Sequence, residues 1–215
     1  MDYNTLLEYG QRCYNANYIR VENSGDYAIE RDGDTVYLLF QWSNGETDWL
    51  NNFDFPAKPY KDMGIEWKCH RGFLRVWKSI EPYIEKTVLD TTVKRFILIG
   101  YSHGAAIATL AHEYVWFHRP DLRDSNLEGY GFGCPRCYWG FTMCDELHER
   151  WKNFYPIRNC QDLVTHVPFL FMGFRHVGNL ICIGDNTYTL RKNKLKCIDA
   201  HRWENYVYSL ENKTK

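Results

Sequence analysis

The passage from residue 93 to 117 constrains the fold of this chain most strongly, because it joins two apolar runs through a Gly-x-Ser-x-Gly motif. Val93 and residues 96–99 form a nearly continuous apolar segment, which is typical of a strand buried on both faces of a parallel sheet. The motif follows at 100–104. Beyond it, with no proline before Pro120, apolar residues recur at helical spacing, namely Ile107, Leu110, Ala111, Tyr114 and Val115. The sequence therefore predicts a strand, a tight turn and a helix in succession.

Ser102 lies in this turn and has two interpretations. It could be a small residue that merely fits between Gly100 and Gly104. It could also be a nucleophile, because a turn squeezed between a strand and a helix exposes the serine Oγ at the sheet edge and aims the helix N-terminus at it. The predicted strand and helix on either side favour the catalytic interpretation.

Length and charge limit the other classes of function. The 215 residues are enough for one domain with a full core, so we expect a single domain over 1–215. The aromatic content of 17% favours a densely packed or aromatic-lined interior over disorder. A net charge of −1 gives no electrostatic basis for binding nucleic acid or an anionic membrane surface.

Targeting signals are not evident in the sequence. The longest apolar stretch, 167–174, is far too short to span a membrane, and the first residues lack the basic and apolar regions of a signal peptide. We therefore expect a cytoplasmic protein whose eight cysteines are reduced.

The remaining pattern alternates helices with short apolar strands, which is typical of an α/β three-layer domain. We predict a segment without regular structure over 43–68. The predicted helices cover 3–16, 73–89, 139–151 and about 200–210, and the predicted strands cover 27–31, 35–42, 127–133, 154–157, and a final hairpin of 177–183 and 187–190.

A serine hydroxyl is a weak nucleophile, so Ser102 needs a base and an acid that orients the base. The best acid is Asp162, because it follows the predicted strand at 154–157 and so lies where the loops at the carboxyl edge of the sheet gather. The competing acids lie on a predicted solvated helix or in a hairpin turn, namely Asp145, Glu146, Glu149 and Asp185.

The choice of base stays open on local patterning alone. Two histidines lie on the helix behind Ser102 and point away from it, and a third lies among charges, namely His112, His118 and His148. The other three downstream candidates, His166, His176 and His201, are equally compatible with the pattern.

Several segments in the same order resemble the class 3 lipase family, the fungal-lipase-like α/β hydrolases. They extend from about 36 to 210 and are similar to F-R-G-[ST] with D-W-L (40–43 and 48–50), H-x-G-F-L (70–74), T-F-G-x-P-R (131–136), V-N-x-x-D-x-V-P-x-L-P and a later H-x-G (158–168 and 173–178), and D-H-x-x-x-Y (200–206). Such an ordered set is more specific than the Ser102 motif alone.

The resemblance implies an α/β-hydrolase three-layer sandwich with a central, mostly parallel sheet and a short lid. It implies that His201 is the base, that Asp162 is the acid, and that His70, His166 and His176 are structural. Ser102 would attack an ester carbonyl, and the oxyanion would be held by the backbone N–H of His103 and by the backbone N–H and hydroxyl of Ser43. This chemistry requires no cofactor and no metal, and its substrate is a lipid or a small acyl ester.

Departures from the family pattern affect the expected substrate more than the reaction. Tyr101, His103 and Ala105 differ from the residues that the family usually carries in the turn around the serine. Asn52 stands where an acid in the family often holds the hydroxyl that corresponds to Ser43. Trp42 beside the oxyanion residue is expected to narrow the acyl pocket. The lid segment 44–50 carries few apolar side chains, so we expect weak interfacial activation and at most transient contact with lipid surfaces.

Three alternatives remain open. Cys134-x-x-Cys137 with Cys144 and His148 could form a zinc site, although the first pair falls in the F-G-x-P-R turn and no second Cys-x-x-Cys exists. The chain could be an inactive hydrolase fold that serves as a binding protein. Within the enzymes, a lipase or esterase competes with a phospholipase, a lysophospholipase or an acyltransferase, and the sequence sets neither the head group nor the oligomeric state.

Overall fold

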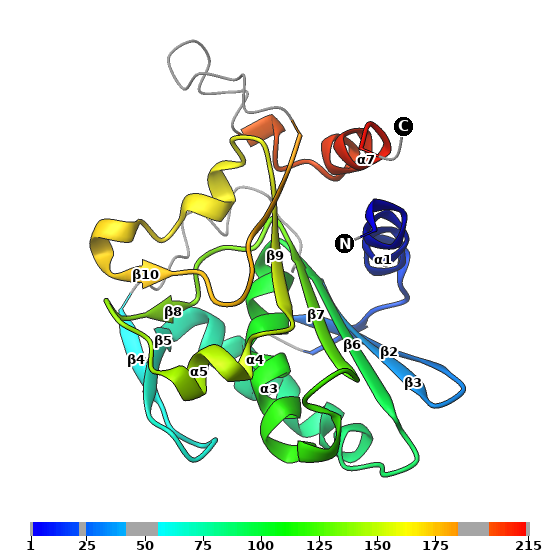
Figure 1. Cartoon of the computed structure of the whole chain (residues 1–215), viewed down its shortest axis with the longest axis vertical. Helices are drawn as coiled ribbons and strands as arrows, with labels where there is room; N and C mark the ends of the chain where they lie inside the picture. The colour runs from blue at the N-terminus through cyan, green and yellow to red at the C-terminus, as the bar shows by residue number, and fades with distance from the viewer. Residues whose placement is uncertain (1, 22–24, 42–55, 185–197, 214–215) are drawn as a thin grey trace.

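The strand predicted before Ser102 lies at the centre of a seven-stranded sheet. The computed structural model describes residues 2–21, 25–41, 56–184 and 198–213. β6 (Arg95–Tyr101) occupies the middle of the strand order β1-β2-β3-β6-β7-β9-β11 (Figure 1). The five strands from β3 to β11 in this order run parallel to one another. β2 pairs antiparallel with both of its neighbours, β1 and β3. The bounds of the others are β1 (Ile19–Arg20), β2 (Asp26–Asp32), β3 (Thr35–Gln41), β7 (Leu127–Phe132), β9 (Phe154–Asn159) and β11 (Ile181–Ile183).

Both faces of this sheet are covered, as the apolar run in β6 predicts. Phe96 and Leu98 pack into one apolar cluster, and Ile97 and Ile99 pack into another on the opposite face. Alternate side chains of a strand point to opposite faces, so a run that is apolar at every position requires cover on both sides.

Helices provide that cover in two layers. α1 (Tyr3–Asn15) and α7 (Trp203–Glu211) lie on one face, and α3 (Arg71–Val88) and α4 (His103–His118) lie on the other (Figure 1). The Asp2 carboxylate caps α1 by accepting from the backbone N–H of Asn4 at 3.0 Å. α3 continues through Pro82 and is longer than the predicted 73–89 only at its start. The expected three-layer α/β arrangement is confirmed.

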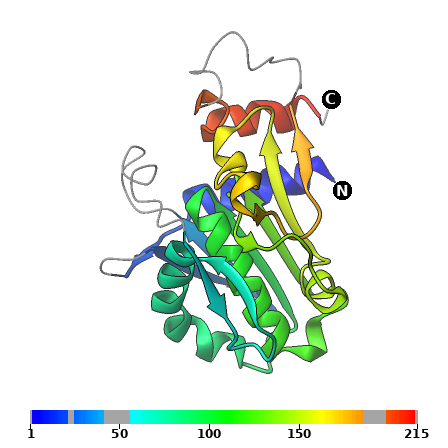
Figure 2. The same cartoon turned by 90° about the vertical axis from the view of Figure 1, so that its left-hand side faces the viewer.

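A second, smaller sheet lies outside α3 and was not predicted. It contains β4 (Ala57–Tyr60), β5 (Trp67–His70), β8 (Tyr138–Trp139) and β10 (Phe174–Arg175), in the antiparallel order β10-β8-β5-β4 (Figures 1 and 2). The interpretation of 43–68 as irregular is therefore wrong at β4 and β5. These four-residue strands are stabilised by cross-strand pairs such as Tyr60 with Trp67, which no local periodicity reveals.

Two further elements differ from the sequence-based prediction. The helix predicted over 139–151 is only α5 (Asp145–Arg150), because Tyr138 and Trp139 pair with β5 and β10 instead. The first strand of the predicted final hairpin is shorter than expected, since β11 covers only Ile181–Ile183 and pairs in parallel with β9, while 187–190 lies outside the described residues. The described residues also form three short 3-10 turns, namely η1 (Pro120–Leu122), η2 (Leu163–His166) and η3 (Leu170–Met172).

The terminal helix also begins later than predicted. α7 starts at Trp203 rather than near residue 200, which leaves His201 in the turn before it. No helix in the described ranges combines the length and the apolar character needed to cross a bilayer.

Candidate active site

Ser102 forms a strained turn between β6 and α4. Its φ of 59° and ψ of −126° lie in a region that non-glycine residues rarely adopt. Its backbone N–H donates to the carbonyl of Phe132 at 2.8 Å, which ties the turn to the neighbouring strand β7. A Cβ on Gly104 would lie 2.1 Å from the carbonyl oxygen of Phe40, and one on Gly100 would lie 2.2 Å from that of Gly104. Both glycines are therefore required by close approach of the backbone.

A continuous hydrogen-bonded chain joins Ser102 to two residues from other elements. Nε2 of His201 lies 2.8 Å from Oγ of Ser102, and its Nδ1 lies 2.8 Å from Oδ2 of Asp162. Asp162 follows β9, and His201 precedes α7, so three separate segments meet at the carboxyl edge of the sheet. Ser102 and Asp162 are fully buried, whereas the His201 side chain keeps 14% of its surface exposed.

The Asp162 carboxylate is held by two further donors. Oδ1 accepts from the backbone N–H of Val164 at 2.9 Å, and Oδ2 accepts from the hydroxyl of Tyr206 at 2.6 Å. Charge-assisted hydrogen bonds of this kind fix a carboxylate in one orientation. The buried acid therefore presents Oδ2 to the imidazole of His201 from a defined position.

The His201 ring is held on its other sides as well. Tyr101 stacks on it with ring centroids 5.2 Å apart and an interplanar angle of 13°, and the Tyr101 hydroxyl donates to the backbone carbonyl of His201. Gly133, with a φ of +60°, faces the ring, and a Cβ there would lie 2.6 Å from Cε1 of His201. Glycine at 133 thus makes room for the imidazole.

The other two open histidine candidates lie elsewhere. Nε2 of His176 is 2.9 Å from the carbonyl oxygen of Thr165, and Nε2 of His166 is 3.3 Å from a guanidinium nitrogen of Arg158. Burial lowers the pKa of His176 to about 4, so its imidazole is neutral near pH 7. His70 accepts from the backbone N–H of Phe73 at the start of α3. These contacts are structural.

His103 is the predicted oxyanion donor that lies within the described residues. His103 is the first residue of α4, and the first N–H groups of a helix have no acceptor within it, so the His103 N–H is available next to Ser102. Its imidazole contacts Phe73 edge-on at 5.2 Å, and burial lowers its pKa to about 4. Ser43, the second predicted donor, and Trp42, Asn52 and the lid segment 44–50 lie outside the described residues.

The cysteines are arranged differently from a zinc site. Cys134 and Cys137 are buried and Cys144 is exposed, and burial raises the pKa of the Cys134 thiol to about 12. Within the parts of the chain that the structure describes, no three His, Cys, Asp or Glu side chains are placed to hold one metal ion.

Sequence reasoning gave no role to three residues that shape this site. Tyr206 ends the D-H-x-x-x-Y segment and Gly133 lies in the F-G-x-P-R segment, so both fell within motifs that the sequence already displays. In the sequence, Tyr101 stands out only as a departure from the family's usual residue before the serine. Its stacking on His201 joins residues 100 positions apart, which no local pattern signals.

The strained serine between strand and helix, with an imidazole and a buried carboxylate in line, is the geometry of a nucleophile activated by a histidine base. Together with a parallel sheet that is covered by helices on both faces, it defines an α/β hydrolase of the serine type. The class 3 lipase family model matches residues 37–172, which is more than half of the chain. This protein belongs to the class 3 lipase family.

Individual relatives agree with this assignment. The chain is 27% identical to a lipase of Rhizomucor miehei over 161 residues, which cover 71% of this chain and 43% of the relative. It is 25% identical to secreted mono- and diacylglycerol lipase A of Penicillium cyclopium over 189 residues, which cover 83% of this chain and 58% of the relative. It thus spans less than half the length of the Rhizomucor lipase.

Solved structures share the fold. The native propeptide complex of Rhizomucor miehei lipase superposes with a TM-score of 0.68 at 21% identity and covers 97% of this chain and 76% of its own. A triacylglycerol lipase whose catalytic centre is described as a serine protease triad superposes with a TM-score of 0.69 at 22% identity, covering 86% of this chain and 79% of its own. At these identities the likeness supports the fold.

Proposed function

We propose that this protein hydrolyses carboxylic esters of lipids or small acyl groups through a Ser102–His201–Asp162 triad. The observation that carries the proposal is the unbroken chain from Oγ of Ser102 through both nitrogens of His201 to Oδ2 of Asp162, with 2.8 Å at each step. The names of its relatives, which are lipases and mono- and diacylglycerol lipases, support the same reaction.

The residues act in two half-reactions. His201 Nε2 takes the proton of Ser102 as Oγ attacks the ester carbonyl, and the resulting imidazolium gives that proton to the departing alcohol. Water then attacks the acyl-enzyme, with His201 again as base, and releases the carboxylic acid and free Ser102. Asp162 orients the imidazole and stabilises its positive charge. The donors from Val164 and Tyr206 keep Asp162 in place throughout.

The tetrahedral oxyanion would be stabilised by the His103 backbone N–H at the start of α4. A donor fixed by the helix is already in position before the reaction, so little reorganisation is needed as the charge develops. Ser43 is proposed as the second donor on the strength of the family motif. The positive φ at Ser102 is the cost of presenting Oγ to the carbon and this N–H to the oxygen of the same ester carbonyl.

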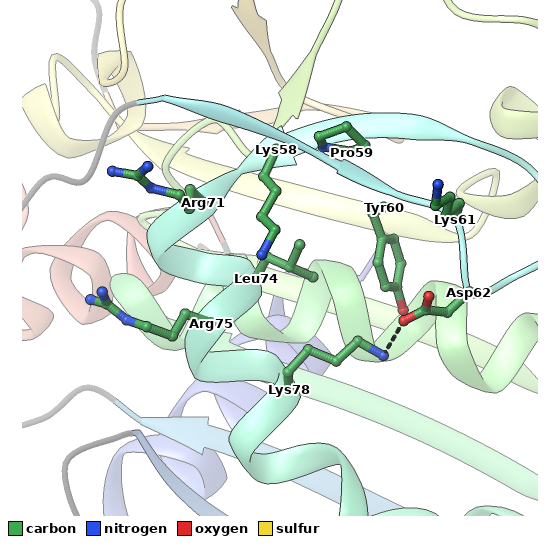
Figure 3. Close-up of a pocket in the computed structure, with 9 residues that line it drawn as sticks. All are labelled: Lys58, Pro59, Tyr60, Lys61, Asp62, Arg71, Leu74, Arg75 and Lys78. Atoms are coloured by element: carbon green, nitrogen blue, oxygen red, sulfur yellow. Dashed lines mark ion pairs between the residues drawn. The ribbon is translucent and has the colours of Figure 1, made fainter.

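A second candidate substrate class, the phospholipids, is favoured by a basic groove along α3. This groove has a volume of about 690 Å³ and lies between β4 and α3, with Tyr60 and Leu74 among its lining residues (Figure 3). Its cationic lining residues are Lys58, Lys61, Arg71, Arg75 and Lys78. Asp62 is the acidic residue of the lining, and it pairs with Lys78 at 2.6 Å. Cations of this density are suited to a phosphate-bearing head group.

The start of α3 lines the groove and also contacts a residue next to Ser102. Arg71 directly follows His70, whose ring stacks on Phe73 at 4.0 Å, and Phe73 in turn contacts His103 beside the nucleophile. The start of α3 thus joins the two regions. We propose that a phospholipid places its phosphate at the start of α3 while its ester lies at Ser102.

A substrate panel tests both classes. The purified chain would be assayed with p-nitrophenyl esters, with mono-, di- and triacylglycerols and with phospholipids, always beside Ser102→Ala. We expect ester hydrolysis that the variant lacks. If phospholipids are the substrates, Lys58→Gln should raise KM for them and leave p-nitrophenyl ester turnover unchanged. Equal activity of the wild-type chain and Ser102→Ala on every ester would refute the proposed function.

A further inference from the structure

An exposed apolar cluster, distinct from the predicted lid, projects from the edge of the small sheet. It consists of Phe141, Phe169, Leu170 and Phe171, which we call the aromatic tip. Phe171 is 84% exposed and Phe141 is 72% exposed, although both are large apolar side chains. The segment bearing η3 projects at the left of Figure 1, on the far side of the molecule from α1 and α7. Clustered exposed apolar groups of this kind indicate an interaction surface.

The aromatic tip is a built feature of the fold. Phe169 and Phe171 stack with ring centroids 5.4 Å apart at 9°. Trp139 connects Phe141 to the segment that carries Phe169 and Phe171. Its Nε1 donates to the carbonyl of Met172 at 2.9 Å, and its ring centroid lies 6.5 Å from that of Phe141. The pairing of β8 with β10 adds a bond from the Gly140 N–H to the Gly173 carbonyl at 3.0 Å. The apolar side chains are therefore held outward by ordered backbone.

The tip is also fixed relative to the proposed triad. The chain runs from Asp162 through η2 directly into Phe169, and Arg136 donates to the carbonyl of Pro168 at 3.0 Å. His176 Nε2 bonds to the carbonyl of Thr165 at 2.9 Å within the same stretch. Contact between the tip and an external surface would therefore place the Asp162 segment at a defined distance from that surface.

Two cations flank the tip. Lys68 Nζ lies 4.7 Å from the ring centroid of Trp139, and Arg175 Nε donates to the carbonyl of Gly140 at 2.9 Å. Both residues are exposed. Apolar side chains that can enter a lipid surface, with a tryptophan and cations beside them, match the layered chemistry of a bilayer that carries anionic phospholipid. The net charge of −1 does not oppose this, because screening makes the local charge decisive.

We propose that the aromatic tip docks this protein on phospholipid surfaces that contain anionic lipid, with Phe141 and Phe171 entering the apolar layer and Lys68 and Arg175 contacting head groups. The inference rests on the proposed function, since a lipid-ester hydrolase must reach substrate held in a surface. It differs from interfacial activation by a moving lid, because the tip is exposed without any rearrangement.

Vesicle co-sedimentation tests the proposal without depending on catalysis. The protein would carry Ser102→Ala and would be mixed with vesicles of phosphatidylcholine alone or with added phosphatidylserine. We expect binding that is stronger with phosphatidylserine and weakened at least about tenfold by Phe141→Ser with Phe171→Ser. Lys68→Gln with Arg175→Gln should remove the preference for phosphatidylserine and make binding insensitive to salt. Tyr208→Ser on α7, a 67% exposed aromatic far from the tip, is the matched control and should bind as before.

Activity measurements separate this inference from the proposed function. In the active background, Phe141→Ser with Phe171→Ser should keep turnover of a soluble p-nitrophenyl ester and lose hydrolysis of vesicle-held substrate. A chain that binds vesicles through the tip but hydrolyses no ester would refute only the function. Unchanged vesicle binding by the double variant would overturn the docking proposal. So would a dimer, measured by sedimentation equilibrium, that dissociates in the double variant, because a second copy would then be the partner.

Discussion

The hydroxyl of Tyr206 donates to Oδ2 of Asp162 at 2.6 Å, and the same oxygen bonds to Nδ1 of His201 at 2.8 Å. Tyr206 is fully buried, and burial, reinforced by the nearby Asp162 carboxylate, raises its pKa well above the ordinary value. It therefore remains a neutral donor over the working pH range. α7 thus carries a group that orients the acid, while His201 lies in the turn that precedes the same helix.

Replacing Tyr206 by phenylalanine tests this orientation. Tyr206→Phe removes one donor to Asp162 and leaves the backbone N–H of Asn159, 3.2 Å from the hydroxyl, without that acceptor. We expect a loss of about 1–2 kcal/mol in the free energy of unfolding and a several-fold lower kcat. KM for a soluble ester should be unchanged, because Tyr206 acts through Asp162. Denaturant unfolding and steady-state kinetics measure both, and a variant with full kcat would show that Val164 and His201 suffice to orient the carboxylate.

Ser102→Ala should fold normally and lose ester hydrolysis. The triad acts as a unit, so the expected loss is about 10⁴- to 10⁶-fold in kcat. The substitution relieves little of the backbone strain at the positive φ, since alanine also disfavours that conformation. A fluorophosphonate should label Ser102 in the wild-type chain, with mass spectrometry locating the adduct. Labelling of another serine would contradict the assignment.

Asparagine substitutions separate the histidines. His201→Asn should abolish turnover, whereas His176→Asn should retain it with reduced stability, because His176 is bonded to the backbone carbonyl of Thr165 and not to Ser102 or Asp162. Asp162→Asn should approach the effect of His201→Asn, since an amide selects the wrong imidazole tautomer. Turnover of a p-nitrophenyl ester by each folded variant is the measurement. The reverse order of losses would mean that His201 is not the base.

Close packing around Gly104, two residues after Ser102, predicts that one added methyl group strongly destabilises the protein. In Gly104→Ala the new Cβ would lie 2.1 Å from the carbonyl oxygen of Phe40, where β3 cannot move without breaking its pairing with β6. We expect destabilisation above about 3 kcal/mol. Gly33→Ala is the control, because its Cβ would meet no atom within 4 Å and only its φ of +61° is unfavourable, which costs about 1 kcal/mol. Thermal unfolding compares the two, and equal losses would refute the steric argument.

His112 predicts a pH dependence of stability. Both of its ring nitrogens are buried without a hydrogen-bond partner among the described residues, and burial lowers its pKa from 6.5 to about 3. Below pH 6.5 the imidazole of His112 binds a proton in the unfolded chain, whereas in the folded chain it stays neutral until the pH approaches 3. The contribution of the neutral His112 to the free energy of unfolding is therefore fully present above pH 6.5. It is lost as the pH falls toward 3, by at most about 1.4 kcal/mol per pH unit.

The matched variant is His112→Leu, which removes this titration and keeps an apolar side chain against Phe154. The difference in unfolding free energy between His112→Leu and the wild-type chain should grow as the pH is lowered from 6.5 to 4. Denaturant titrations at several pH values measure it. A difference that stays constant with pH would contradict the burial of a neutral imidazole.

Local pattern was enough for the centre of the fold. β6 and α4 were predicted because apolar side chains at every position indicate burial on both strand faces, and recurrence at 3.6 residues indicates a helix. The small sheet was missed for the opposite reason. Strands β4 and β5 have four residues each, and their stability comes from partners such as Trp67 and Tyr138, which stack at 5.8 Å although 71 positions separate them in the sequence.

The sequence by itself determined the strand, the strained Ser102 turn and the helix behind it, because those elements depend on the residues next to them in the chain. The resemblance to a family, carried by short motifs, pointed to Asp162 and His201. Only the tertiary structure decided that His201, rather than His166 or His176, lies 2.8 Å from Ser102, and that Tyr206 holds the acid. The physical reason is that these contacts join residues 44 to 99 positions apart, where backbone topology rather than local preference sets which side chains meet.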